Sequence, residues 1–209
     1  MSYSQNDEEG VLRQHFGDRK GHFLDVGAYD GRTFSNTLAL AEAGWGGVLV
    51  EPSAGPFHSL CRIYREVFGD ADVRFDFVHA LVGVTADPLV TFWACDDAVS
   101  TTEEANRALW DGKASVPFVL TLAPQIALSD LLEACWGDTT FDLVSIDTEG
   151  TSVDLLRAFC ACVPVAAWPE VFVVEHDGAC EKIHRLLGPR GYQQAYFSGE
   201  NLVMIRYGK

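Results

Sequence analysis

The sequence predicts an α/β protein whose single Rossmann-like domain is doubly wound around a mostly parallel sheet. Short apolar runs alternate with stretches of helical spacing along the 209 residues, as in repeated βαβ units. Such units join parallel strands through right-handed crossovers. The last two apolar runs are separated only by the turn at residues 198–201, so they should form a hairpin that adds one antiparallel strand. The expected order is therefore β-α-β-α-β, an excursion, and then β-α-β-α-β-β.

Residues 1–20 form a polar lead-in with a short helix at 11–16, and the domain is expected to extend from residue 21 to residue 209. In its first half, turn residues separate apolar strands from helices. Gly44 should end the first helix, because glycine readily adopts the left-handed backbone of a helix end. The elements expected in this half are strands at 23–26, 48–51 and within 75–82, and helices at 35–43 and 57–67.

An insertion is expected at about 84–122, where turn residues and a hydroxyl-rich loop interrupt the alternation. We expect its first strand, at 89–95, to pair as a hairpin with the strand segment that precedes it. A helix at 103–109 and a strand at 117–122 should follow. The alternation then resumes with helices at 130–134, 152–159 and 180–187 and strands at 141–146, 171–174, 192–197 and 202–207.

The turn after the first strand has the features of a ligand cradle. Its glycines would let the backbone approach a ligand, and Ser35 is placed to cap the next helix. The spacing Gly27-x-x-x-Gly31 is not the Gly-x-Gly-x-x-Gly of a dinucleotide site. Asp25 and Asp30 would repel a pyrophosphate but suit a cationic ligand with hydroxyl and amino groups. S-adenosylmethionine is such a ligand, and an acidic turn without any ligand is the alternative.

Acidic residues follow several of the expected strands. Glu51 lies 20 residues beyond Gly31, where an acid commonly holds a ribose diol; a water-facing acid is the alternative. Asp147, Glu149 and Glu175 follow two later strands. The carboxyl ends of parallel strands share one sheet edge, and carboxylates gathered there repel one another. The pattern therefore predicts a cationic ligand, a metal ion, or both.

The overall charge excludes several partners. A net charge of -15 and a pI near 4.6 argue against nucleic acid and anionic lipid, since binding either normally requires a basic patch. No apolar run approaches the roughly 20 residues of a membrane span, and residues 1–20 lack the apolar core of a signal peptide, so a cytoplasmic location is expected. The six cysteines include no Cys-x-x-Cys pair, which disfavours a zinc knuckle. Nothing in the sequence favours one oligomeric state.

Several segments together resemble the FkbM family of methyltransferases, in order over about residues 21–207. The resemblance implies a class I, Rossmann-like, S-adenosylmethionine-dependent methyltransferase with a seven-stranded sheet whose last strand is antiparallel. Members of this family are mostly O-methyltransferases on small molecules or sugars. The segments that carry the resemblance are Phe23 to Gly31, Ser35-Asn36-Thr37, Gly44 to Gly47, Glu51-Pro52 and Ser145 to Gly150.

The resemblance also implies roles by position. The first glycine turn and Asp147 would lie at the methionine end of the cofactor, Glu51 would hold the ribose, and the region of His79 and Ala80 would border the adenine. The insertion matches the family poorly, although Ser100-Thr101 lies where the family often has a serine-bearing loop. The residues expected to bind the cofactor are Asp25, Gly27, Ala28, Asp30, Gly31, Ser35, Asn36, Glu51, Pro52, Ala80 and Asp147.

Methyl transfer to a hydroxyl needs an aligned acceptor and a base that takes its proton. The candidates for this base are Asp147, Glu149, Glu175 and His176. His176 lies beside acids at the expected ligand edge, and the alternative is a loop histidine bonded to a neighbouring acid. No metal is expected, although Asp147, Glu175 and His176 together could hold Mg²⁺ as a minority alternative.

The sequence thus favours S-adenosylmethionine-dependent O-methylation of a small-molecule or sugar hydroxyl. A methyltransferase acting on nucleic acid or protein is an alternative. For nucleic acid, the charge and the absence of an Asn/Asp-Pro-Pro-Tyr/Phe motif and of a Pro-Cys pair argue against it. A module that keeps the fold and performs no chemistry is a second alternative. A nicotinamide dehydrogenase is disfavoured by the missing third glycine and by Asp30 in the turn.

Overall fold

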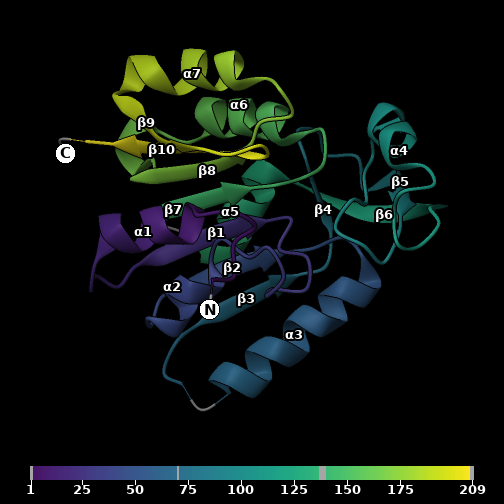
Figure 1. Cartoon of the computed structure of the whole chain (residues 1–209), viewed down its shortest axis with the longest axis horizontal. Helices are drawn as coiled ribbons and strands as arrows, with labels where there is room; N and C mark the ends of the chain where they lie inside the picture. The colour runs from purple at the N-terminus through teal and green to yellow at the C-terminus, as the bar shows by residue number, and fades with distance from the viewer. Residues whose placement is uncertain (1, 70, 137–139, 208–209) are drawn as a thin grey trace.

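The computed structural model describes residues 2–69, 71–136 and 140–207; Met1 and residues 208–209, at the ends of the expected lead-in and domain, lie outside the described residues. Its main sheet has seven strands in the order β3-β2-β1-β7-β8-β10-β9 (Figure 1). These strands are β1 (His22–Val26), β2 (Gly46–Val50), β3 (Phe75–Val78), β7 (Leu143–Ile146), β8 (Val171–Glu175), β9 (Tyr192–Phe197) and β10 (Asn201–Arg206).

The strand directions confirm the predicted fold class. Strands β1, β2, β3, β7 and β8 pair in parallel, whereas the last strand, β10, is antiparallel to both of its neighbours, β8 and β9. The central strands consist almost entirely of apolar residues because both faces of the sheet are covered. The chain is therefore a doubly wound, mostly parallel α/β protein, with the C-terminal hairpin supplying the antiparallel strand.

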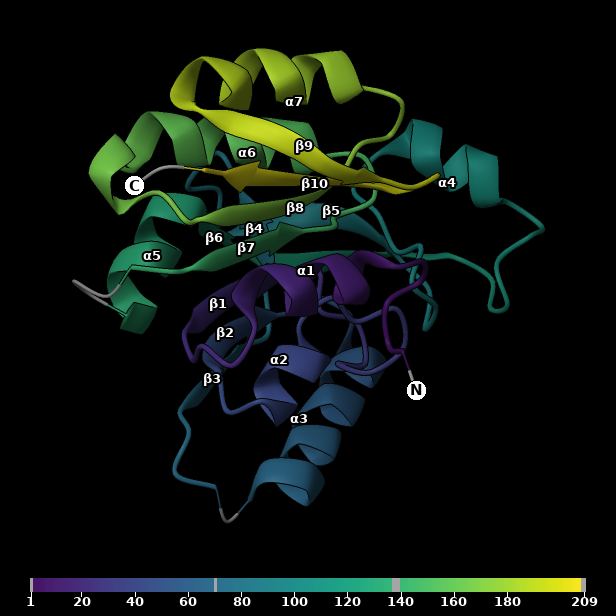
Figure 2. The ribbon, with the colours of Figure 1, turned by 60° about the vertical axis from the view of Figure 1, so that its left-hand side comes forward.

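Helices cover the two faces of the main sheet (Figure 2). Alternate residues of each strand point to opposite faces, so Phe23 joins one core and Leu24 the other. The first core is covered by α1 (Glu8–Phe16), α2 (Leu38–Glu42) and α3 (Ala54–Phe68), and the second by α5 (Leu128–Trp136), α6 (Ser152–Cys162) and α7 (Cys180–Leu187). Among the described residues, no helix combines the length and the apolar character needed to cross a lipid bilayer.

A second, three-stranded sheet stands beside the carboxyl ends of the main strands, at the right of Figure 1. It contains β4 (Leu81–Gly83), β5 (Leu89–Ala94) and β6 (Val119–Ala127), and α4 (Glu104–Trp110) lies between β5 and β6 in the chain. The predicted hairpin between residues 89–95 and the preceding segment was wrong, because β5 pairs antiparallel with β6. In this sheet the nine-residue β6 lies between β4 and β5, so the chain reverses direction at residues 84–88 without pairing these two strands with each other.

The loop between β1 and α2 is longer than predicted. The first turn of the expected helix at 35–43 is absent, and α2 begins at Leu38. The Ser35 hydroxyl oxygen still accepts a hydrogen bond from the Leu38 N–H at 3.0 Å, so it supports the start of this helix from outside. Two loop residues that are not glycine, Tyr29 and Phe34, have φ angles of 49° and 60°. These two residues lie outside the right-handed helical region, so the chain forms a loop here in place of a first helical turn.

Candidate functional site

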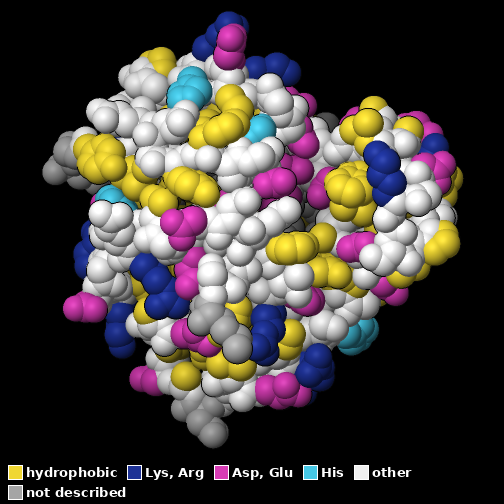
Figure 3. All heavy atoms as spheres, viewed as in Figure 1, with side chains coloured by type: hydrophobic (Ala, Val, Ile, Leu, Met, Phe, Trp, Pro, Cys, Tyr) yellow, Lys and Arg dark blue, Asp and Glu magenta, His cyan; other side chains and the backbone are white. Residues whose placement is uncertain are grey.

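A cavity of about 790 Å³ opens between the carboxyl ends of the parallel strands and the β5–α4–β6 segment. In Figure 3, acidic side chains gather beside the hollow that separates the two parts. The strand order reverses direction at β1, which is where ligands bind in open α/β sheets. The sequence-predicted residues that line this cavity are Asp25, Gly27, Ala28, Ser35, Asn36, Glu51, Pro52, Ala80, Asp147, Glu149 and Glu175.

Gly27 lets the turn after β1 press against the neighbouring strand. Its φ angle is +88°, and a Cβ atom at this position would lie 1.6 Å from the Asp147 carbonyl oxygen. The N–H groups of Gly27 and Ala28 both donate to the Val50 carbonyl at 3.0 Å. No other residue type fits such an approach, so the ends of β1, β2 and β7 are held together at the cavity wall.

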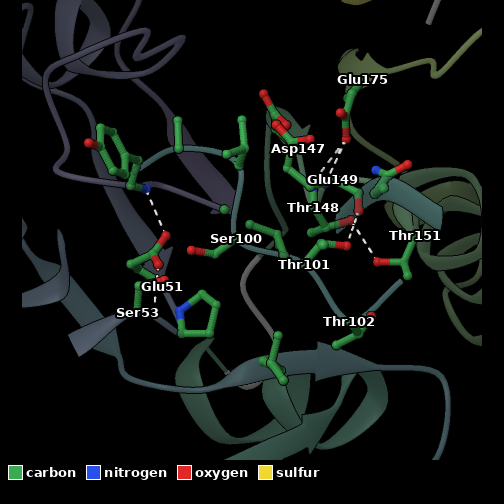
Figure 4. A pocket seen from close by; sticks show the side chains of 18 of the residues that line it. Glu51, Ser53, Ser100, Thr101, Thr102, Asp147, Thr148, Glu149, Thr151 and Glu175 are labelled. Atoms are coloured by element: carbon green, nitrogen blue, oxygen red, sulfur yellow. Dashed lines mark hydrogen bonds between the residues drawn. The ribbon is translucent and has the colours of Figure 1, made fainter. Parts of the chain in front are cut away.

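Glu51 follows β2 and is only 5% exposed. Its Oε2 accepts the Tyr29 N–H at 3.0 Å, and its Oε1 accepts the Ser53 N–H at 2.7 Å (Figure 4). Burial raises the pKa of Glu51 to about 7. Each carboxylate oxygen has about two acceptor sites, so both oxygens keep room for a further donor such as one hydroxyl of a diol.

Asp25, in β1, is buried at the same edge. The Thr37 hydroxyl donates to its Oδ2 at 2.6 Å, and burial raises the pKa of Asp25 to about 6. Nearby, the Asn36 amide donates to the Ser145 hydroxyl at 3.4 Å, while its buried Oδ1 has no hydrogen-bond partner in the described part of the chain. An acid and a free amide oxygen together suit a ligand with N–H donors and a positive charge.

Three acids gather on the opposite side of the cavity from Glu51 (Figure 4). Asp147, Glu149 and Glu175 each place a carboxylate oxygen within 4.8 Å of the other two. Burial first, and the Glu175 charge second, raises the pKa of Glu149 to about 8 and holds the pKa of Asp147 well above its ordinary value. Burial also raises the pKa of Glu175 to about 7, with the Asp177 charge as the next cause. Three hard oxygen donors could hold Mg²⁺, but with Glu149 in place of the predicted His176.

Glu175 shapes the turn that follows β7. Its Oε2 accepts hydrogen bonds from the Glu149 N–H at 2.8 Å, the Thr148 N–H at 3.2 Å and the Ser152 hydroxyl at 2.8 Å. The backbone of Glu149 is left-handed, with φ at 51°. This conformation directs the turn so that the Glu149 carboxyl meets the other two acids. One oxygen of Glu175 is thus occupied in holding the turn.

His176 does not belong to this cluster. Its Nδ1 accepts the Gly178 N–H at 3.0 Å, so the ring proton lies on Nε2, which is 3.2 Å from the Ser198 carbonyl oxygen. The ring stacks on Phe197 with 5.1 Å between ring centroids. His176 is buried and is absent from the described residues that line the cavity. Both ring nitrogens are engaged, and the partners are not the neighbouring acids that the alternative interpretation named.

Asp30 and Gly31 are likewise outside the described cavity wall. The Asp30 carboxylate accepts the N–H groups of Arg32 and Thr33 at 2.8 and 2.7 Å and so stabilises its own loop. Gly31 faces the helix layer, because a Cβ there would lie 2.3 Å from Leu60 Cδ1. Both residues therefore stabilise the turn on the side that faces away from the cavity. Of the two residues expected near the adenine, Ala80 lines the cavity, whereas the His79 ring stacks on Phe57.

Other lining residues had no role in the sequence-based prediction. They come from the loop after β1, the residue before α3, helix α4 and the loop that follows α4, and their contacts with the cavity depend on tertiary packing. Their one local signal is the hydroxyl-rich loop before α4. These residues are Tyr29, Ser53, Asn106, Leu109 and Lys113.

The raised pKa values make the unliganded protein lose stability as pH rises. For Glu149 the folded protein holds the proton up to about pH 8, whereas the ordinary value is 4.5. The stabilisation is therefore complete below pH 4.5 and is lost as pH rises through 8. We expect Glu149→Gln to flatten this dependence and to raise the melting temperature at pH 8.5 by roughly 5 °C. Calorimetric melting from pH 5 to pH 8.5 would test this, with the exposed Glu66→Gln as control; a parallel decline in wild type and Glu149→Gln would contradict it.

Comparisons with known proteins concern the family and the fold of the chain. The model of the methyltransferase FkbM domain matches residues 25–193. The methyltransferase FkbM of Methylobacillus flagellatus KT superposes with a TM-score of 0.60 at 12% identity, over 97% of this chain and 48% of that one. The chain thus spans about half the length of that relative.

Two further solved structures show the same fold. A methyltransferase-like protein of Silicibacter pomeroyi DSS-3 has a TM-score of 0.54 at 13% identity, with 99% of this chain and 88% of that one covered. The magnesium protoporphyrin IX methyltransferase of Synechocystis PCC 6803 with bound SAM has a TM-score of 0.51 at 11% identity, with 95% and 76% covered. No curated protein matches the chain. Because the family match extends over most of the sequence, the chain belongs to the FkbM family of S-adenosylmethionine-dependent methyltransferases.

Proposed function

We propose that this protein transfers a methyl group from S-adenosylmethionine to a hydroxyl of a small molecule or sugar. The observation that carries the proposal is one cavity with two acidic sides. Buried Glu51 has free acceptor sites on one side, and the cluster of Asp147, Glu149 and Glu175 lies on the other. This charge distribution complements a cation that also presents a diol.

The residues around Gly27 offer groups whose chemistry matches the cofactor. Glu51 would accept hydrogen bonds from the two ribose hydroxyls, and Pro52 and Ala80 would border the base. Asp25 and the free Asn36 Oδ1 would receive the methionine ammonium. When bound, S-adenosylmethionine supplies a methyl group that is already activated by its positive sulfur.

We infer that Glu149, which lines the cavity within the acid cluster, is the base. Its pKa of about 8 lies close to neutral pH, where proton transfer is most effective. Glu175 already accepts three hydrogen bonds through Oε2, which suits it to holding the turn. We therefore assign proton removal to Glu149 and positioning to Glu175. Asp147, at the end of β7, would face the methionine end of the cofactor.

The cavity wall also indicates the class of acceptor. Lys113 is the one lysine or arginine among the described lining residues, against acids at every side. The net negative charge of the cavity wall would repel phosphates and carboxylates, so a neutral hydroxyl compound fits best. At the opening, Leu109 and Trp110 of α4 line the cavity yet remain 63% and 38% exposed. An acceptor with an apolar face, such as a sugar ring, could pack against them.

Titration calorimetry with S-adenosylmethionine and S-adenosylhomocysteine, with NAD as control, tests the proposal. We expect micromolar binding of the first two compounds and none of NAD. Incubation with radiolabelled cofactor and a panel of neutral, aminated and phosphorylated sugars should then label a neutral hydroxyl acceptor. A folded protein that binds neither cofactor form would refute the proposal. Cofactor binding with no transfer to any acceptor would favour the non-catalytic alternative.

A further inference from the structure

The structure joins the β5–α4–β6 segment to the proposed base through one buried hydroxyl. Thr101 is 1% exposed, and its Oγ1 donates to the Glu149 carbonyl oxygen at 2.6 Å. The same oxygen accepts the Glu103 N–H at 2.9 Å. Thr101 therefore bonds both to the acidic turn after β7 and to Glu103, the residue directly before α4.

Thr101 is itself firmly placed. Its N–H and C=O pair with the C=O and N–H of Trp93 in β5, at 3.1 and 2.8 Å. The hydroxyl thus projects from an edge of the small sheet toward the turn. A hydrogen bond from such a fixed donor restricts its acceptor more than one from a mobile side chain would.

The Glu149 peptide needs this support. A left-handed conformation costs a residue with a side chain roughly 1–2 kcal/mol and persists only where the surroundings enforce it. Glu175 holds the N–H of Glu149, and Thr101 holds its C=O. If one of these two bonds is lost, the turn can relax and move the Glu149 carboxyl away from the cluster.

Helix α4 packs directly on the same turn. A Cβ on Gly150 would lie 2.9 Å from Asn106 Nδ2 and 3.2 Å from Glu103 Cγ. Asn106, Leu109 and Trp110 of this helix also line the cavity. An acceptor that contacts α4 therefore touches an element bonded, through Thr101, to the residue that would take its proton.

We propose that Thr101 is a positioning residue that fixes the Glu149 carboxyl in the cavity and couples the acceptor-contacting helix α4 to it. The inference rests on the proposed function for its catalytic meaning, but the positioning itself is measurable without any acceptor. In this proposal, the segment between β5 and β6 stabilises the acidic turn after β7 and also encloses the substrate.

The test compares Thr101→Val, which keeps the shape but loses both hydrogen bonds, with Thr101→Ser, which keeps the hydroxyl. Thr91→Val, at an exposed position of β5, is the matched control. Carbon NMR of labelled glutamate carboxyls, assigned with Glu149→Gln, follows the titration of Glu149. We expect its pKa to move from about 8 toward its ordinary 4.5 in Thr101→Val and to stay in place in Thr101→Ser and Thr91→Val.

An unchanged Glu149 titration in folded Thr101→Val would overturn the proposal. If that variant does not fold, Thr101→Cys replaces it with a weaker donor, and the same two outcomes apply. Calorimetry with S-adenosylmethionine on these variants separates the two ideas. If Thr101→Val binds the cofactor as tightly as the wild type but has a shifted Glu149 pKa, the positioning role is supported. If the wild-type protein itself does not bind the cofactor, only the proposed function is refuted. Once an acceptor is known, Thr101→Val should change the pH profile of kcat while the KM for the cofactor stays constant.

Discussion

Glu51→Ala is expected to weaken the binding of S-adenosylmethionine by 100-fold or more. The change removes both carboxylate oxygens, and hydrogen bonds to charged groups contribute about 1.5–3 kcal/mol each. It also leaves the N–H groups of Tyr29 and Ser53 without their acceptor, so the loop that borders the cofactor loosens. Titration calorimetry on the purified variant measures the loss directly.

Two further variants make the Glu51 result specific. Glu66→Ala removes an acid that is 61% exposed on the neighbouring helix α3, and it should bind like the wild type. Glu51→Gln keeps one acceptor oxygen and should bind with intermediate affinity. It also serves as the deciding variant if Glu51→Ala fails to fold. Wild-type affinity in a folded Glu51→Ala protein would remove Glu51 from the cofactor site.

Gly27→Ala should destabilise the whole domain by about 4 kcal/mol. Its Cβ would lie 1.6 Å from the Asp147 carbonyl oxygen, so the ends of β1 and β7 must separate. Overpacking costs about 1–3 kcal/mol, and the left-handed φ of +88° adds roughly 1–2 kcal/mol. For a domain of this size, the melting temperature should fall by roughly 10 °C, as calorimetry would show.

The control for Gly27 is a glycine with a similar backbone and open surroundings. Gly178 has a φ of +74° and nothing within 4 Å of an added Cβ, so Gly178→Ala should show the backbone cost alone. The difference between the two variants isolates the clash with Asp147. Equal melting temperatures would mean that the strand ends move apart freely, and our account of this turn would then be wrong.

The sequence predicted the main sheet well because its signals are local. Strands such as Val48–Leu49–Val50 are apolar on both faces, which indicates a buried parallel strand wherever it pairs. The pairing of β5 could not be read in the same way. Its true partner, β6, begins 25 residues after Ala94, and nothing near either strand encodes that choice. The start of α2 was displaced because the loop from Gly27 to Thr37 is held by tertiary contacts.

The site residues could also be predicted where the signal was local and not where it depended on tertiary contacts. Gly27 and Glu51 were identified because each directly follows a strand, and strand ends meet at one edge. His176 also follows a strand, but its side chain turns to Phe197, and the orientation of a loop side chain depends on what packs beside it. The importance of Thr101 depends on a contact with Glu149, 48 residues away in the chain, so only the folded structure reveals it.

The left-handed residues of this protein bear on how it could be engineered. Tyr29, Glu149 and Asp177 have φ angles of 49°, 51° and 46° and follow three neighbouring strands at the cavity edge. Glycine at each position would remove the strain of the left-handed backbone, so a selection for higher melting temperature is expected to favour glycine there. The same substitutions would free the backbone that places the acids. Thermal stability and the proposed catalysis therefore compete at this edge, and stabilising changes belong elsewhere in the molecule.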